Sequence, residues 1–537
     1  MKDYLIGIDV GTGSARAGLF STNGQLVASA KRDIALFNRG PNLYEQASDD
    51  IWQAVCASVR AVIADAGINP AAVAGLGMDA TCSLVVIGPE GRPLPVGEPE
   101  HPERNIIVWM DHRAIDQANR INATGHDVLR YVGSQISPEM ETPKLLWLKE
   151  NRPEIFARAE HFFDLTDFLT WRATGSLARS ICTVTCKWTY LGHEKRWDES
   201  YFRAIGLAEL ASDDFARIGA DVVDAGTALG TGLTREAAAE LGLMAETPVG
   251  AGLIDAHAGG IGTVGWQDEK TSGSATSRMA YVFGTSACTM TSTDAPAFVP
   301  GVWGPYYSAM VPGLWLNEAG QSAAGAAIDH LVRFHPASGE AGELAEAAGV
   351  SLTQWLSEQA ATLTPEGTDV ALLADGLHVV PEFLGNRAPF ADPEAKALIA
   401  GLDLDGSVDA LVRLYVAGIC GLGYGLRQII AAQQAKGIET GTVVVSGGAG
   451  QSPLVRRLLA DTTGLTVAAP ATAEPVLLGS AMLGAVAAGL QPNLEAAMAA
   501  MSAVGETYRP GGGAMEAYHA KRFEGFELLQ SVGRRLR

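Results

Sequence analysis

A short pattern occurs twice in this chain, and it constrains the fold more than any other feature. Residues 5–20 form two largely apolar stretches around the turn Gly11-Thr12-Gly13-Ser14, and residues 280–288 repeat this arrangement around Gly284-Thr285-Ser286. Two short apolar strands joined by a glycine turn form a β-hairpin. The two hairpins lie about half of the 537-residue chain apart. Repetition at half length predicts two related lobes that each begin with the same hairpin.

Strand and helix patterns alternate between these hairpins. Residues 83–87 and 106–109 are apolar enough for strands, whereas residues 51–66 and 111–123 have the period of helices. This alternation predicts the α/β class.

The lobe boundary and a third glycine turn can also be placed. The polar run 267–274 follows a glycine-rich segment, so we expect lobes of residues 1–265 and 266–537. In the second lobe, residues 442–461 predict a strand, a glycine turn at 446–450 and an amphipathic helix. A turn of this kind lets the backbone approach a ligand closely.

The charge balance and the cysteines limit the partners. With 39 Lys+Arg and 60 Asp+Glu, the net charge of −21 repels phosphate backbones and anionic lipid, so we expect neither nucleic acid nor membrane as a partner.

The N-terminus lacks the pattern of a signal peptide, so we expect a cytoplasmic protein and leave a homodimer open. Cys182 and Cys186 have no further Cys or His near them in the sequence, which favours reduced thiols over a zinc site.

Two carboxylates are the candidates for chemistry. Asp9 precedes the turn Gly11-Thr12-Gly13-Ser14, whose N–H groups and hydroxyls suit phosphate oxygens, and it can orient a hydrated Mg²⁺. Asp255 follows the apolar residues 249–254, where it can accept the proton of an alcohol during phosphoryl transfer. Each also has a plain structural interpretation, as part of an ordinary hairpin or as a helix N-cap.

Taken together, the motifs resemble those of the FGGY carbohydrate kinases. The resemblance spans essentially the whole chain, and it rests on four segments in this order: Asp9-x-Gly11-Thr12-x-Ser14-x-Arg16, Asp255-Ala256-His257, Phe283-Gly284-Thr285-Ser286 and Ser446-Gly447-Gly448. It implies a two-lobed, actin-like ATPase fold of the ribonuclease H-like type, with the active site in the cleft between the lobes. It also implies phosphorylation of a small sugar or polyol with ATP and Mg²⁺.

The same resemblance implies roles for individual residues. Asp255 would be the catalytic base, and Asp9 would hold Mg²⁺ through water. The small residues 479–485 would form a second connector between the lobes. The residues that would bind ATP are Gly11, Thr12, Gly13, Ser14, Arg16, Gly284, Thr285, Ser286, Gly447, Gly448 and Gln451.

Further segments resemble the ribulokinase branch of this family, namely residues 79–84, 182–188, 317–321 and 385–389. By this resemblance the sugar would be bound by Ala80, Lys187, Asp255 and Glu318. Lys187 can donate to a ketose carbonyl or hydroxyl, and Glu318 can accept from hydroxyls. The leading reaction is therefore the conversion of D-ribulose to D-ribulose 5-phosphate.

Other functions stay open at this point. Within the family, the substrate could be L-ribulose or another ketose or polyol, because stereospecificity depends on the placement of a few hydrogen bonds. An actin-like or chaperone-like ATPase would contain similar hairpins, but it would leave Lys187, Glu318 and Asp255 without a role. A catalytically silent sugar sensor would require loss of the base, and Asp255 is present.

Overall fold

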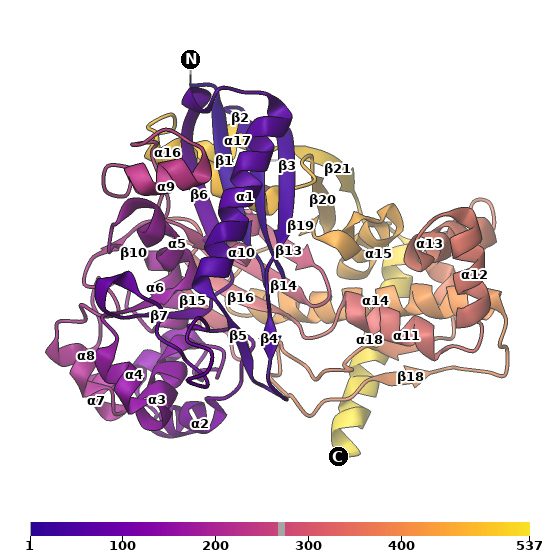
Figure 1. Cartoon of the computed structure of the whole chain (residues 1–537). Coiled ribbons are helices and arrows are strands. Elements are labelled where there is room, and N and C mark those ends of the chain that lie inside the picture. The colour runs from indigo at the N-terminus through magenta and orange to yellow at the C-terminus, as the bar shows by residue number, and fades with distance from the viewer. Residues whose placement is uncertain (1, 267–273) are drawn as a thin grey trace.

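The computed structural model describes residues 2–266 and 274–537, and its elements form two lobes that are each built on a twisted sheet (Figure 1). The proposed boundary at 267–274 falls almost entirely outside the described residues. The sheet of the first lobe has the order β12-β6-β1-β2-β3, with bounds Leu253–Ile254, Val73–Ala80, Tyr4–Val10, Ser14–Ser21 and Leu26–Asp33. Its strands β12, β6 and β1 are parallel to one another, whereas β1 and β2 form the first predicted hairpin.

The second lobe contains a seven-stranded sheet that repeats this plan. Its order is β15-β16-β14-β13-β19-β20-β21, with bounds Trp303–Tyr307, Trp315–Gln321, Ala287–Thr293, Arg278–Phe283, Thr442–Ser446, Thr466–Pro470 and Val504–Tyr508. Strands β13 and β14 form the second predicted hairpin, and β13 is parallel to β19 as β1 is to β6. The repeated hairpin is thus the start of a repeated sheet.

Helices and minor strands complete both lobes. A further sheet in the first lobe has the order β4-β5-β8-β7-β9, with bounds Phe37–Asn38, Tyr44–Gln46, Ile106–Ile107, Leu84–Ile87 and His161–Asp164. The helices of the first half are α1 (Ser48–Ala66), α2 (Ile115–Ala123), α3 (Glu141–Asn151), α4 (Pro153–Arg158), α5 (Leu165–Thr174), α6 (Ile181–Lys187), α7 (Glu199–Ala204), α8 (Ala208–Ser212), α9 (Arg235–Leu241) and α10 (Asp255–Val264). Those of the second half are α11 (Gly325–Phe334), α12 (Ser338–Ala348), α13 (Leu352–Leu363), α14 (Val408–Gln434), α15 (Pro453–Thr463), α16 (Pro475–Ala487), α17 (Leu494–Met501) and α18 (Ala514–Arg535). Two pairs of short strands remain: β10 (Arg179–Ser180) with β11 (Val222–Val223), and β17 (His378–Val380) with β18 (Leu398–Ala400).

Helix α16 belongs to the second half of the sequence but packs against the sheet of the first lobe, where Figure 1 shows it beside β1 and β6. Glycines allow this close approach. A Cβ atom at Gly7 would lie 1.9 Å from the carbonyl oxygen of Leu477, and one at Gly77 would lie 2.1 Å from that of Ser480. The small residues expected at 479–485 therefore lie within a longer helix that joins the two halves of the chain.

One described helix, α14, is long and apolar enough to cross a membrane by length and composition alone. However, 83% of its apolar window is buried inside the protein, as in the central helix of a globular core. It packs against α15 and α11 in the second lobe.

Most predicted elements are confirmed, with one difference near Asp111. The helix expected from residue 111 begins only at Ile115. The buried Asp111 carboxylate instead accepts hydrogen bonds from the backbone N–H groups of Tyr44 and Arg113 and forms an ion pair with the Arg113 guanidinium. These bonds hold the segment in a loop conformation, because a side chain that binds neighbouring N–H groups competes with helical hydrogen bonding.

Candidate active site

Three carboxylates meet at one edge of the first-lobe sheet. Asp9 on β1 lies directly opposite Asp79 on β6, and β12 lies next to β6, so that Asp255 follows immediately after β12. Carboxyl ends of parallel strands meet at the same edge of a sheet, and ligands bind there in open α/β sheets. Asp255 is the first residue of α10, and its Oδ1 accepts a hydrogen bond of 2.7 Å from the Ala256 N–H.

The proximity of these groups changes their acidity. Burial, followed by the charge of Asp9, raises the pKa of Asp255 to about 6. The same two causes raise the pKa of Asp79 well above its usual value. A carboxylate with a pKa near neutral pH is suited to accept a proton from an alcohol. Asp79 was not among the predicted site residues, although its position beside Asp9 follows once β1 and β6 are known to pair in parallel.

The donor set at this edge fits a magnesium ion. All three groups offer carboxylate oxygens, which Mg²⁺ prefers. Among residues 2–266 and 274–537, Asp79 Oδ1 is buried and has no hydrogen-bond partner, and a cation would relieve the mutual repulsion that contributes to the raised carboxyl pKa values. Asp9 itself receives a hydrogen bond of 2.7 Å from Arg16 Nε, and Arg16 also forms an ion pair with Glu474. Arg16 thus contacts Asp9 in this structure.

Both hairpin turns are closed by a backbone hydrogen bond, which spans four residues in the first turn and three in the second. The Gly11 N–H donates to the carbonyl of Ser14 across 3.0 Å, and the Gly284 N–H donates to that of Ser286 across 2.9 Å. A Cβ atom at Gly13 would meet no atom within 4 Å, so the front of the first turn is open. Both turns therefore present small residues to an open space, as the predicted phosphate site requires.

Neighbouring side chains hold the first turn in place. The Thr12 hydroxyl accepts a hydrogen bond of 2.9 Å from Trp109 Nε1, and the Thr12 carbonyl accepts one of 2.8 Å from Gln46 Nε2. Trp109 belongs to the loop that Asp111 and Arg113 stabilise. This loop consequently supports the turn from the side of the first lobe.

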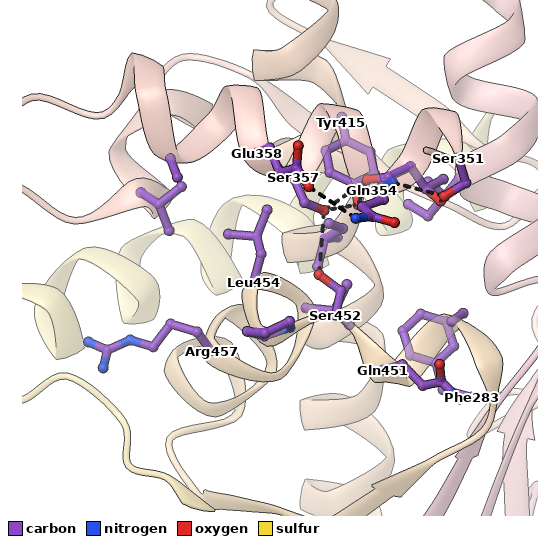
Figure 2. A pocket seen from close by; sticks show the side chains of 18 of the residues that line it. Phe283, Ser351, Gln354, Ser357, Glu358, Tyr415, Gln451, Ser452, Leu454 and Arg457 are labelled. Carbon is purple, nitrogen blue, oxygen red and sulfur yellow. Dashed lines mark hydrogen bonds between the residues drawn. The ribbon is translucent and has the colours of Figure 1, made fainter. Parts of the chain in front are cut away.

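A large cavity of about 1540 Å³ lies in the second lobe, beside the second hairpin (Figure 2). Of the residues predicted to bind ATP, it is lined by Gly284, Thr285, Gly448 and Gln451. Gly447 is absent from its lining. A Cβ atom there would lie 2.6 Å from the Phe283 carbonyl, and its φ is 89°, so Gly447 shapes the turn.

The opposite wall of this cavity comes from residues that carried no sequence motif. Ser357 on α13 forms hydrogen bonds with the Tyr415 hydroxyl at 2.9 Å and with Ser452 at 3.4 Å, and Gln354 donates to Glu358 across 3.1 Å (Figure 2). An ordinary amphipathic helix such as α13 gives no indication in the sequence of which face lines a cavity. Its role follows only from its position beside the glycine turn.

The predicted sugar residues come from both lobes, and the charge of Lys187 acts on both Asp255 and Glu318. Ala80 ends β6 and pairs with Ile254, and Lys187 ends α6. Glu318 comes from β16 of the second lobe. Lys187 Nζ lies 5.7 Å from the centre of the Trp303 ring, so an aromatic face accompanies these polar groups.

Glu318 is the centre of a buried charge network. Its Oε1 lies 3.2 Å from Arg387 Nη2, and its Oε2 lies 3.5 Å from His257 Nε2. Burial acts to raise the pKa of Glu318, but the nearby His257 and the charges of Lys187 and Arg387 lower it to about 2. Glu318 is therefore ionised at neutral pH and suited to accept hydrogen bonds from hydroxyls.

Arg387 and His257 were not predicted as site residues. Arg387 lies in one of the segments that favoured the ribulokinase branch, and its guanidinium also stacks 4.3 Å from the centre of the Trp303 ring. No histidine was expected beside Cys182 from its neighbours in the sequence, but α10 places His257 Nδ1 3.1 Å from the Cys182 sulfur. The two residues are 75 positions apart in the sequence, so spacing could not show the contact.

The repeated hairpins, the cavity beside the second one and a carboxylate with a raised pKa are the parts of a phosphotransferase with an actin-like ATPase fold. Comparison with known proteins agrees. Residues 4–262 match the N-terminal domain of the FGGY family of carbohydrate kinases, and residues 279–488 match its C-terminal domain. The chain belongs to this family and is a sugar kinase.

Individual relatives are similar over most of the chain. An FGGY carbohydrate kinase domain-containing protein from Homo sapiens is 46% identical over 94% of this chain and 92% of its own length. A D-ribulokinase from Saccharomyces cerevisiae is 38% identical over 90% of this chain and 72% of its own length. The crystal structure of xylulose kinase from Rhodospirillum rubrum shares the fold, with a TM-score of 0.80 at 22% identity over 99% of each chain. The resemblance to the family and to its ribulokinases is thereby confirmed.

Proposed function

We propose that this kinase transfers the γ-phosphoryl group of ATP to the 5-hydroxyl of D-ribulose, giving D-ribulose 5-phosphate and ADP. The observation that carries the proposal is that Lys187 lies close enough to Glu318 and to Asp255, which come from different lobes, for its charge to lower the pKa of both. An ammonium and an ionised carboxylate can together read the carbonyl and hydroxyls of a ketose. The similarity to the yeast D-ribulokinase supports this choice of sugar.

Asp255 is the proposed general base. As the hydroxyl oxygen forms its bond to the γ-phosphorus, the bond from that phosphorus to the β,γ-bridging oxygen breaks, and the hydroxyl proton passes to the Asp255 carboxylate. ADP leaves with the electron pair of the broken bond. This reaction needs mainly alignment and charge stabilisation from the protein.

The two hairpins and the cavity are the proposed ATP site. Gly11, Thr12, Gly13 and Ser14 on one side and Gly284, Thr285 and Ser286 on the other offer N–H groups and hydroxyls to the phosphates. Gly448 and Gln451 line the cavity in which the adenosine would lie, with Gly447 shaping the turn. Asp9 would hold Mg²⁺ through water, with Asp79 nearby, and a bound Mg²⁺ neutralises phosphate charge.

Release of ADP with MgATP and a panel of acceptors tests the proposal. The panel contains D-ribulose, L-ribulose, D-xylulose, L-xylulose, ribitol, L-arabinitol and glycerol. We expect kcat/KM to be highest for D-ribulose. A preference for another acceptor would refute the choice of sugar, and ATP hydrolysis that no acceptor stimulates would favour an actin-like or chaperone-like ATPase instead.

A further inference from the structure

His257 is a fully buried imidazole that the proposed mechanism does not use. It lies two residues after Asp255 on α10. Its Nδ1 forms a hydrogen bond of 3.1 Å with the Cys182 sulfur, and its Nε2 lies 3.5 Å from Glu318 Oε2. Both ring nitrogens thus face a defined group, which fixes the orientation of the ring.

These contacts join the three elements that carry the polar sugar residues. Cys182 belongs to α6, which ends at Lys187. His257 belongs to α10, which begins at Asp255, and Glu318 belongs to β16 in the other lobe. A chain from Cys182 through His257 to Glu318 therefore ties together the elements whose relative placement decides how a ketose is held.

The charges along this chain support one another. Burial lowers the pKa of His257, but the neighbouring Cys182 and Glu318 outweigh burial and raise it, so the imidazolium form is favoured. In turn the nearby His257 contributes to the low pKa of Glu318. The Ile254 N–H also donates to the Cys182 sulfur across 3.4 Å. A buried charge is tolerated when it is paired and hydrogen-bonded in this way.

The same residues also include the atoms of a potential metal site, because the Cys182, Cys186 and His257 donor atoms lie within 4.8 Å of one another. Zinc in structural sites takes four ligands. Within the described part of the chain this group supplies three. A chain of contacts through His257 accounts in addition for the approach of Nε2 to Glu318, so we favour it over a metal site.

We propose that Cys182 and His257 are positioning residues for sugar recognition: Cys182 orients the His257 ring, and His257 holds the Glu318 carboxylate toward the sugar. This inference rests on the proposed function. The buried Cys182 thiol and His257 imidazole would both act through Glu318, without touching the sugar themselves.

Steady-state kinetics of four variants test this inference, with D-ribulose and ATP varied separately. We expect Cys182→Ala and His257→Leu to raise the KM for D-ribulose about tenfold or more, as loss of a buried charged contact would, with the KM for ATP within about twofold of wild type. Cys182→Ser and His257→Gln keep a polar group at each position, and we expect them to restore most of the sugar affinity. Cys420→Ala is the matched control, because Cys420 is an equally buried thiol in the core of the second lobe.

Thermal unfolding and circular dichroism show whether each variant folds. If His257→Leu does not fold, the KM values of Cys182→Ser and His257→Gln decide the test. Equal changes in both KM values, or no change in either, would overturn the positioning role while leaving the kinase activity of the wild type intact. Stoichiometric zinc in the purified wild type, measured by elemental analysis, would also overturn it and assign the group to a metal. If the wild type phosphorylates no ketose, the proposed function fails first, which the panel of acceptors shows separately.

Discussion

At the scale of single residues, Asp255 depends on its neighbours for its chemistry. An isolated aspartate is a weak base at neutral pH, with a pKa of about 4. Burial and the nearby Asp9 raise the pKa of Asp255 to about 6, which brings it close to the range in which a general base works well. Its partial exposure at the start of α10 leaves it accessible to a bound hydroxyl.

Replacement of this carboxylate tests its role as base. Asp255→Asn keeps the size of the side chain but removes the proton acceptor, so we expect kcat to fall about 10³-fold. Sugar and ATP binding, measured by calorimetry, should persist. Asp116→Asn is a suitable control because Asp116 is an exposed carboxylate in the first turn of another helix. Turnover near that of the wild type in Asp255→Asn would remove Asp255 from the base role.

The pH dependence follows from the same raised pKa. Asp255 must be ionised to accept a proton, so activity is retained above its pKa and is lost as the pH falls through it. We expect the acid limb of the kcat/KM profile for the sugar to lie near pH 6, close to the raised pKa of Asp255. A profile that stays flat down to pH 5 would contradict this assignment.

At the scale of elements, the contact of α16 with β1 and β6 depends on the absence of side chains. The carbonyl groups of α16 occupy the space where Cβ atoms of Gly7 and Gly77 would lie. This contact fixes α16 on strands β1 and β6, which carry Asp9 and Asp79. Ser480 on α16 also donates a hydrogen bond to Asp79.

Adding one methyl group to β6, at Gly77, tests the packing of α16 against this strand. We expect Gly77→Ala to lower the free energy of unfolding by about 2 kcal/mol or more, because neither backbone can move without disturbing its element. Gly339→Ala is the control, since a Cβ atom at this helical position would meet nothing within 4 Å. Denaturant unfolding measures the free energy of unfolding of both variants. Equal values would show that α16 and β6 accommodate the added methyl group without loss of stability.

At the scale of the whole molecule, the proposed sugar site draws residues from both lobes. Lys187 and Asp255 come from the first lobe and Glu318 from the second, while the cavity beside the second hairpin lies in the second lobe. A sugar that contacts residues of both lobes stabilises the arrangement in which the two lobes lie close together. Its binding should therefore be coupled to that of the nucleotide.

Calorimetry with a non-hydrolysable ATP analogue measures this coupling. We expect saturating D-ribulose to lower the Kd of the analogue about fivefold or more, and the analogue to lower the Kd of D-ribulose by the same factor. Glu318→Ala removes the proposed sugar contact of the second lobe, so we expect weaker sugar binding and loss of the coupling, with little change in the Kd of the analogue alone. An unchanged coupling in this variant would show that Glu318 does not link the lobes.

Much of the fold was accessible from local patterns. The two hairpins, the glycine turn after β19 and helix α1 were expected close to their observed bounds, because apolar periodicity and glycine turns act over a few residues. The start of α2 was missed, since the side chain of Asp111 outweighs the helical pattern there. That competition involves Tyr44, which is far away in the sequence.

By itself, the sequence determined the class, the family and the residue types that phosphoryl transfer to a sugar requires, because those motifs are contiguous and their order is diagnostic. Only the tertiary structure decided which groups act together. It set Asp79 beside Asp9, joined His257 to Cys182 and Glu318, and made α13 a wall of the cavity beside the second hairpin. The physical reason is that pKa values, ion pairs and cavities depend on distances between residues from different elements, and pairing of strands and packing of helices set those distances.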